Sequence, residues 1–219
     1  MIDKIKKLVD VLSTNETNEE APQPLSSEEQ EQILQDLLGA APPKEPDLRL
    51  IGLFTEVIDE KVAELVHALL YLDEVNKVRK EDKPIGFYVC TYGGSADDMF
   101  ALYDVMRQVR ETTEIHTIGM GKVMSAGVLL LAAGTKGKRK IGKYCRVMIH
   151  SVVGGSHGSL PNLANEMEAM QQIQKDYIDA LCNETSMSKK DLKKLLERKV
   201  NVYLSAEEAV ELGIADIII

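Results

Sequence analysis

The feature that most constrains the fold is a regular alternation of short apolar segments with amphipathic segments, which runs from Leu48 to the end of the chain. The apolar segments have the length and residue types of buried strands and are found at 48–54, 85–90, 114–120 and 145–151. Apolar residues at helical spacing separate them, as in "DEKVAELVHALLYLDEV" at 59–75, where Asp59 is a candidate helix cap. Strands that alternate with helices predict an α/β fold.

Further helices are expected along the rest of the chain. They are predicted at 96–109, after Ser125, over about 160–183 and from near Ser188. "LSAEEAVELG" at 204–213 predicts a last helix, with a capping box from Ser205 to Glu208 and a terminating Gly213.

The first part of the chain has a different composition. Residues 1–47 are polar, acidic and punctuated by proline, and a short helix could form within 29–43. We therefore expect a flexible N-terminal extension over 1–47 and one domain over 48–219. Limited proteolysis should then leave a resistant core that starts near Leu48.

Charge and composition exclude several classes of function. The formal net charge of −9 argues against nucleic acid as the main partner. No apolar stretch approaches the roughly 18 residues that span a bilayer, so we expect a cytoplasmic protein without a membrane segment. The 3 cysteines are widely separated and odd in number, which favours neither a disulfide framework nor a metal site. No cofactor is expected.

Three junctions between expected strands and helices carry side chains or backbone groups suited to catalysis. They are the glycine pair Gly93–Gly94, Ser125 at the start of an apolar helix, and His150 at the end of a strand. A serine hydroxyl becomes a nucleophile when a base lies within hydrogen-bond reach, and the resulting oxyanion needs preorganised donors. Ser125, His150 and the amides of Gly94 and Ala126 could supply these parts.

Each of these residues also has a structural interpretation. A serine before an apolar helix is most often an N-cap, and a histidine that closes a strand is most often structural. A Gly-Gly pair is more often a turn than an oxyanion hole. Ser125 also lacks the G-x-S-x-G context of an α/β-hydrolase.

Longer segments resemble one family from Leu48 to the end. "YGGSADDMFALYDVM", "GKVMSAGVLLLAAGTKGKR", "RVMIHS" followed by "GGSHG", and "YLSAEEAVELGIAD" match the Clp protease proteolytic subunit (ClpP) family in order and spacing. The resemblance implies a ClpP/crotonase-type α/β fold of repeated ββα units with an extended handle helix. It also implies a self-compartmentalised serine peptidase made of stacked heptameric rings, which a hexameric AAA+ unfoldase supplies with unfolded polypeptides.

Position by position, the resemblance assigns roles to several residues. Ser125 matches the nucleophile and His150 the general base, while Gly94 and Ala126 match the oxyanion-hole amides. The stretch that contains Gly154, Gly155 and Ser156 matches a glycine-rich strand that pairs with an extended substrate. The helix over 160–183 matches the handle, and its apolar residues suit either a helix–helix interface or an ordinary core face.

The third position of the catalytic triad departs from the family. The family has aspartate three residues before "LSA", and this chain has Asn201 there. An asparagine can accept a hydrogen bond from the histidine but cannot stabilise the imidazolium with a charge. Glu197 could supply that charge if it reached His150. Tyr92 also replaces a proline of the family before the glycine pair.

Three functions remain open at this point. The first is a serine endopeptidase subunit that forms homo-oligomeric rings, a tetradecamer in the family. The second is a weakly active or inactive subunit that assembles with an active paralogue, which Asn201 favours. The third is a crotonase-type acyl-CoA enzyme on the same fold, which would not need Ser125 beside His150.

Overall fold

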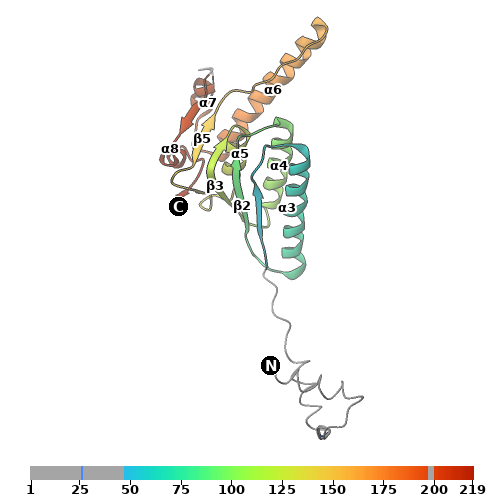
Figure 1. Ribbon diagram of the computed structural model, residues 1–219, viewed down its shortest axis with the longest axis vertical. Helices are drawn as coiled ribbons and strands as arrows, with labels where there is room; N and C mark the ends of the chain where they lie inside the picture. Colours follow the sequence, from blue (N-terminus) through green and yellow to red (C-terminus); the bar gives the residue numbers. More distant parts are fainter. Residues whose placement is uncertain (1–25, 27–46, 197–199) are drawn as a thin grey trace, which may run out of the picture. The chain divides into compact units, whose positions relative to one another are not determined.

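The computed structural model describes Ser26, residues 47–196 and residues 200–219. The strands are β1 (Leu50–Leu53), β2 (Ile85–Thr91), β3 (Ile115–Met124), β4 (Lys140–Ile141), β5 (Arg146–Ile149), β6 (Val202–Leu204) and β7 (Ile217–Ile218). The helices are α3 (Asp59–Arg79), α4 (Ala96–Val109), α5 (Ala126–Ala132), α6 (Leu160–Glu184), α7 (Lys189–Leu196) and α8 (Ala206–Glu211). The α/β fold expected from the sequence is confirmed, with helices α3 and α5 packed against the sheet and α4 packed against both of these helices (Figure 1).

The sheet is mostly parallel and is centred on β3. Strands pair in the order β1-β2-β3-β4-β7, while β5 pairs with both β3 and β6. The first half of β3 pairs with β4 at Ile118 and Gly119, and its last three residues pair with β5. Among the described strands, only β6 runs antiparallel to its neighbour, β5. The end of β3 is therefore flanked by β2 and β5.

The core forms where the apolar faces of the helices meet the sheet. In α3 the buried apolar residues Val62, Leu65, Leu69 and Leu72 follow the helical spacing of the sequence. Met99, Leu102, Met106 and Val109 do the same in α4. Helix α5 is buried along its whole length, because it lies between the sheet and its neighbouring helices.

Of the helix caps predicted from the sequence, the one at α8 is present and the one at α3 is not. At α8 the capping box between Ser205 and Glu208 is present in both directions. At α3 the expectation that Asp59 caps the helix is wrong, because Asp59 is its first residue and Ile58 is the N-cap, without a side-chain bond. The Asp59 carboxylate instead accepts a hydrogen bond from the N–H of Glu60 at 2.9 Å.

Helix α6 has two distinct parts. Its C-terminal part is buried in the domain, with Tyr177, Ile178 and Leu181 in the core. Its N-terminal part projects beyond the sheet (Figure 1), and Leu163 and Met167 are 36% and 53% exposed. The apolar side chains of this projecting part therefore do not form an ordinary core face within the subunit.

A buried carboxylate fixes the C-terminal end of α6. Glu184 accepts hydrogen bonds from the Tyr103 hydroxyl at 3.0 Å and from both terminal nitrogens of Arg110, and its backbone carbonyl accepts from Arg139. Burial alone would raise the pKa of Glu184, but the hydrogen bonds and charge of Arg110 outweigh it and keep that pKa below its ordinary value.

Several predictions lie outside the described residues. They include the flexible extension before residue 47, its short helix within 29–43, and the position of Glu197. Within the described residues, no helix is both long and apolar enough to cross a bilayer. The same part of the chain contains no group of three or more side chains suited to a metal ion.

We predict that Glu184→Gln lowers the free energy of unfolding by about 3 kcal/mol, because it leaves Arg110 without its charged partner in a buried site. The folded chain holds the pKa of Glu184 below its unfolded value. Its contribution should therefore be complete above about pH 4.3 and be lost as the pH falls further. Thermal unfolding against pH measures both effects. The exposed Glu111→Gln is the matched control, and an equal midpoint for the two variants would contradict the prediction.

Candidate active site

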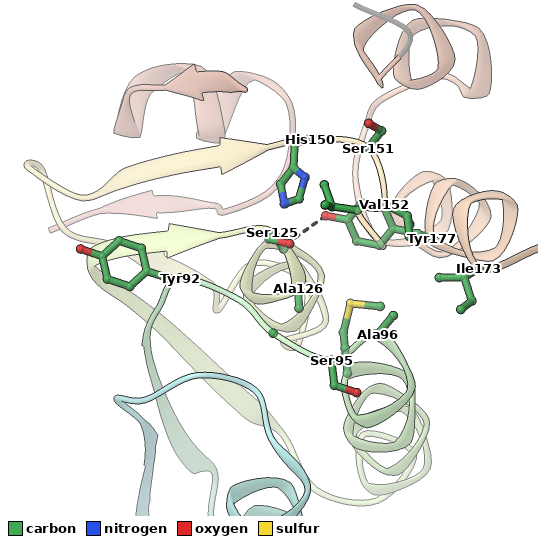
Figure 2. Close-up of a pocket in the computed structure, with 13 residues that line it drawn as sticks. Tyr92, Ser95, Ala96, Ser125, Ala126, His150, Ser151, Val152, Ile173 and Tyr177 are labelled. Atoms are coloured by element: carbon green, nitrogen blue, oxygen red, sulfur yellow. Dashed lines mark hydrogen bonds between the residues drawn. The ribbon is translucent and has the colours of Figure 1, made fainter. Parts of the chain in front are cut away.

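A pocket of about 360 Å³ lies where β3, β5, α4 and α6 meet. Ser125, Ala126, His150 and Gly94 all line it, so the structure brings together four residues that were selected from the sequence. Figure 2 shows the His150 imidazole directed towards Ser125. The remaining lining residues are Tyr92, Ser95, Ala96, Met99, Ser151, Val152, Val153, Ile173 and Tyr177.

Ser125 occupies a sharp turn between β3 and α5. Its backbone has φ 52° and ψ −121°, and only one other described non-glycine residue, Lys80, has a positive φ. Such a conformation costs about 1–3 kcal/mol for a residue with a side chain. The N–H of Ser125 donates to the carbonyl of Met148 at 2.8 Å, which extends the β3–β5 ladder by one bond and holds the turn.

Ser125 does not cap its helix through its side chain, as a conventional N-cap serine would. Ser125 occupies the N-cap position of α5, but its side chain makes no capping hydrogen bond. By contrast, the Ser95 hydroxyl caps α4 by accepting a hydrogen bond from the Asp98 N–H. The Ser125 hydroxyl lies beside the pocket and is not used to stabilise its helix.

The glycine pair lies directly against this hydroxyl. A Cβ built on Gly93 would come 2.6 Å from Ser125 Cβ and 3.1 Å from Ser125 Oγ, and Gly93 has φ 103°. Gly94 has φ 154°, and a Cβ there would come 2.2 Å from the carbonyl oxygen of Val57. Both positions therefore require glycine for space as well as for conformation.

Two backbone N–H groups remain for a ligand. The Val57 N–H donates to the carbonyl of Gly93, and the Val57 carbonyl accepts a hydrogen bond from the N–H of Ser95. These two bonds lie on either side of Gly94 and leave the Gly94 N–H unused. The Ala126 N–H is the first of α5 and has no partner within the helix. Two donors of this kind are what a developing oxyanion requires.

His150 follows β5 immediately and is partly buried. Within the described residues no hydrogen bond joins Ser125 Oγ to the His150 ring. Contacts between a nucleophile and its base are often loose in a protein without substrate. The arrangement can support proton transfer from Ser125 to His150 once the two side chains close on each other.

The β5–β6 ladder places Asn201 opposite His150. Ile149 pairs with Val202 in the antiparallel register, so one further step sets His150 against Asn201. Asn201 is exposed, and no hydrogen bond joins it to His150. The position that the sequence suggested for the third residue is thus close in register but makes no bond.

The glycine-rich segment differs from the expected strand. Residues 151–157 have no regular secondary structure, and Gly154, Gly155 and Ser156 are exposed and do not line the pocket. The three residues before them do line it. No described strand pairs with this segment, so no ladder stabilises it as a strand.

The sequence did not identify Tyr177 and Met99 as pocket residues. Both belong to helices whose apolar spacing is typical of core packing, and both are indeed buried. Tyr177 could have been noticed because it is a polar aromatic residue on the apolar side of α6. Its hydroxyl donates to the carbonyl of Ser125 at 3.0 Å.

Comparison with known proteins identifies the family of the chain. Residues 46–219 match the Clp protease family. The chain is 32% identical over 171 residues to ATP-dependent Clp protease proteolytic subunit 1 of Prochlorococcus marinus strain MIT 9312, covering 78% of this chain and 84% of that protein. It is 34% identical over 172 residues to proteolytic subunit 4 of Rhodococcus jostii, covering 78% and 84%.

A third relative, the ATP-dependent Clp protease proteolytic subunit of Borreliella afzelii, is 31% identical over 168 residues, with 77% of this chain and 81% of the relative covered. The chain belongs to the Clp protease family, whose members are serine peptidases. Its parallel sheet with interleaved helices is consistent with the ClpP/crotonase fold.

We predict that Gly93→Ala greatly slows covalent labelling of Ser125 by a fluorophosphonate, because the added methyl group would displace the serine side chain. Gly137→Ala is the matched control, since Gly137 also has a positive φ of 80° but a Cβ there would contact nothing within 4 Å. The labelling rates of the two variants are compared, and circular dichroism checks that both are folded. The comparison separates the effect of the contact with Ser125 from the effect of backbone strain at a glycine with positive φ. Equal labelling of the two variants would contradict the prediction.

Proposed function

We propose that this chain is a serine endopeptidase subunit of a self-compartmentalised, ATP-dependent Clp-type protease that hydrolyses peptide bonds of unfolded polypeptides. One observation carries the proposal: the Ser125 hydroxyl is held in a strained turn, without a capping role, in the pocket that His150, Gly94 and Ala126 also line. Membership of the Clp protease family supports it.

In the proposed reaction, His150 accepts the proton of Ser125 as Ser125 Oγ attacks the carbonyl carbon of the substrate. The Gly94 and Ala126 N–H groups donate to the oxyanion that forms. His150 then returns the proton to the leaving amine, and water hydrolyses the acyl-enzyme by the same route in reverse. Because the mechanism is acyl transfer through these groups, it requires neither a metal nor an organic cofactor.

The substrate would lie across the pocket as an extended chain. Apolar side chains of Ala96, Met99, Val152 and Ile173 line the pocket and suit an apolar side chain of the substrate. Gly154, Gly155 and Ser156 would form a strand against the peptide when it binds. Such pairing through the backbone gives affinity with little sequence selectivity, which suits unfolded polypeptides.

The subunit would act within rings. The exposed apolar side chains of α6, Leu163 and Met167 among them, suit contacts between helices of stacked heptameric rings. The names of the relatives support an ATP-dependent assembly, and we propose an AAA+ unfoldase of the Clp type as the partner, in the cytoplasm. Native mass measurement tests the assembly, and a stable monomer at micromolar concentration would contradict it.

A second candidate is a weakly active or inactive subunit that assembles with an active paralogue. Asn201 favours it, because this residue makes no bond to His150 and carries no charge. The numbered subunits among the relatives agree with families of paralogues. A crotonase-type acyl-CoA enzyme is disfavoured by membership of the Clp protease family and by the placing of Ser125 with His150 in one pocket.

A fluorophosphonate probe followed by peptide mapping distinguishes these candidates. We expect an adduct on Ser125 in the unmodified chain, and neither adduct nor peptide hydrolysis in Ser125→Ala, which should keep its fold and its native mass. An unlabelled Ser125 in the intact assembly would refute the peptidase and favour the inactive subunit.

We predict that Asn201→Asp raises kcat by up to about 10⁴-fold, the factor lost when a triad aspartate is replaced by asparagine in a serine protease of another fold. A carboxylate at this position would stabilise the imidazolium that forms as His150 takes the proton. The gain should appear in kcat, since the charge develops on the way to the transition state.

Val200→Asp is the control for this prediction. Val200 is exposed, and the substitution adds the same negative charge one residue away from position 201. The pH at which activity is half-maximal should rise in Asn201→Asp, because a carboxylate that stabilises the imidazolium also favours the protonated base, and it should stay constant in the control. An unchanged kcat and pH profile in Asn201→Asp would mean that residue 201 does not act on His150.

A further inference from the structure

We propose that Tyr177 is a positioning residue for the oxyanion hole, which it holds from α6 through the backbone carbonyl of Ser125. The inference rests on the proposed peptidase function. Tyr177 is only 5% exposed, and its hydroxyl donates to the Ser125 carbonyl at 3.0 Å. Figure 2 shows this bond at the edge of the pocket, between α6 and the start of α5.

The bond acts on the peptide unit that carries a candidate oxyanion donor. The carbonyl of Ser125 and the N–H of Ala126 belong to one planar peptide group, in which they point in opposite directions. A donor that fixes the direction of the carbonyl therefore also fixes the direction of the N–H. A hydrogen bond to the carbonyl oxygen further polarises the group, which strengthens the N–H as a donor.

This peptide unit needs an external restraint. Ser125 has φ 52° and ψ −121°, a conformation from which a serine would relax by rotating the peptide unit that follows it. The other bond to the same carbonyl comes from the Val128 N–H at 3.0 Å, within the first turn of α5 itself. Tyr177, 52 residues away in sequence, is the contact that ties the unit to a separate helix.

The chemistry of Tyr177 suits a permanent donor. Burial raises the pKa of its hydroxyl above the ordinary range of tyrosine, so the group remains protonated at every pH at which peptidases of this kind work. Burial is the cause of this raised pKa, and no charged side chain contributes to it. The hydroxyl can therefore donate constantly to Ser125, and ionisation does not interrupt the bond.

A second side chain on the same face of α6 holds the other half of the site. Gln174, one turn before Tyr177, accepts a hydrogen bond from the Val152 N–H at 2.7 Å through its side-chain carbonyl. Val152 lies two residues after His150. One face of α6 thus fixes both the peptide unit after the nucleophile and the segment after the base.

The test compares Tyr177→Phe with Tyr103→Phe. Each replacement keeps the ring and removes one hydroxyl that donates at 3.0 Å, from a side chain that is 5% or 4% exposed respectively. Tyr103 donates to Glu184 and does not line the pocket. The two variants should therefore lose similar stability but differ in catalysis.

In the intact assembly, we expect Tyr177→Phe to lower kcat for a peptide substrate about tenfold, or about 1.4 kcal/mol, with KM unchanged. Tyr103→Phe should leave both constants unchanged. Gln174→Leu should also lower kcat, and Gln174→Glu should restore it, because the carboxylate keeps an acceptor for Val152. Lys175, Lys189 and Lys193 line a neighbouring pocket with Gln174 and suit that charge.

A measurement without catalysis separates this inference from the proposed function. Hydrogen exchange of the peptide that covers Ser125–Val128, followed by mass spectrometry, should be faster in Tyr177→Phe and unchanged in Tyr103→Phe. Equal exchange and equal kcat in the two variants would overturn the positioning role. If the unmodified chain fails to label at Ser125 but exchange is still faster in Tyr177→Phe, the peptidase is refuted, and Tyr177 is shown to restrain the Ser125–Ala126 peptide unit without a catalytic purpose.

Discussion

The site depends on one set of backbone hydrogen bonds, the ladder that joins β3 to β5 and β5 to β6. It pairs Met124 with Met148 and continues through the Ser125 N–H, so the candidate nucleophile is placed beside the strand that His150 follows. The antiparallel side of β5 then sets Asn201 opposite His150. Ser125 and His150 therefore line one pocket, and Asn201 lies next to His150 in register. Side-chain contacts refine this arrangement, and the backbone establishes it.

Much of the fold could be predicted from periodicity, because burial on one face leaves a clear spacing in α3 and α4. Helix boundaries depend on local bonds that the spacing does not contain. Asp59 has the right residue type for a cap, yet the helix begins at Asp59 itself. The glycine-rich segment around Gly154 was expected as a strand, but a strand needs a partner, and the chain alone provides none at this place.

The candidate site could be predicted only in part. Ser125, His150 and Gly94 follow the ends of strands, so both the type of each residue and its position indicated a site. Tyr177 was missed because its spacing is that of a core residue, and the sequence cannot show that its hydroxyl meets a backbone carbonyl 52 residues away. The bond of Gln174 to Val152 was missed for the same reason. Both contacts arise from tertiary packing of α6.

The backbone of Ser125 bears on whether this chain is an active subunit. A glycine could adopt φ 52° and ψ −121° without the cost that a side chain brings, so the folded protein would be more stable with glycine at this position. Serine is thus maintained at a thermodynamic disadvantage, and its hydroxyl does not offset that cost by capping α5. A subunit that had become a purely architectural part of a ring would gain from losing it. A strained serine without a capping bond is therefore what the proposed peptidase would need and what an architectural subunit would not.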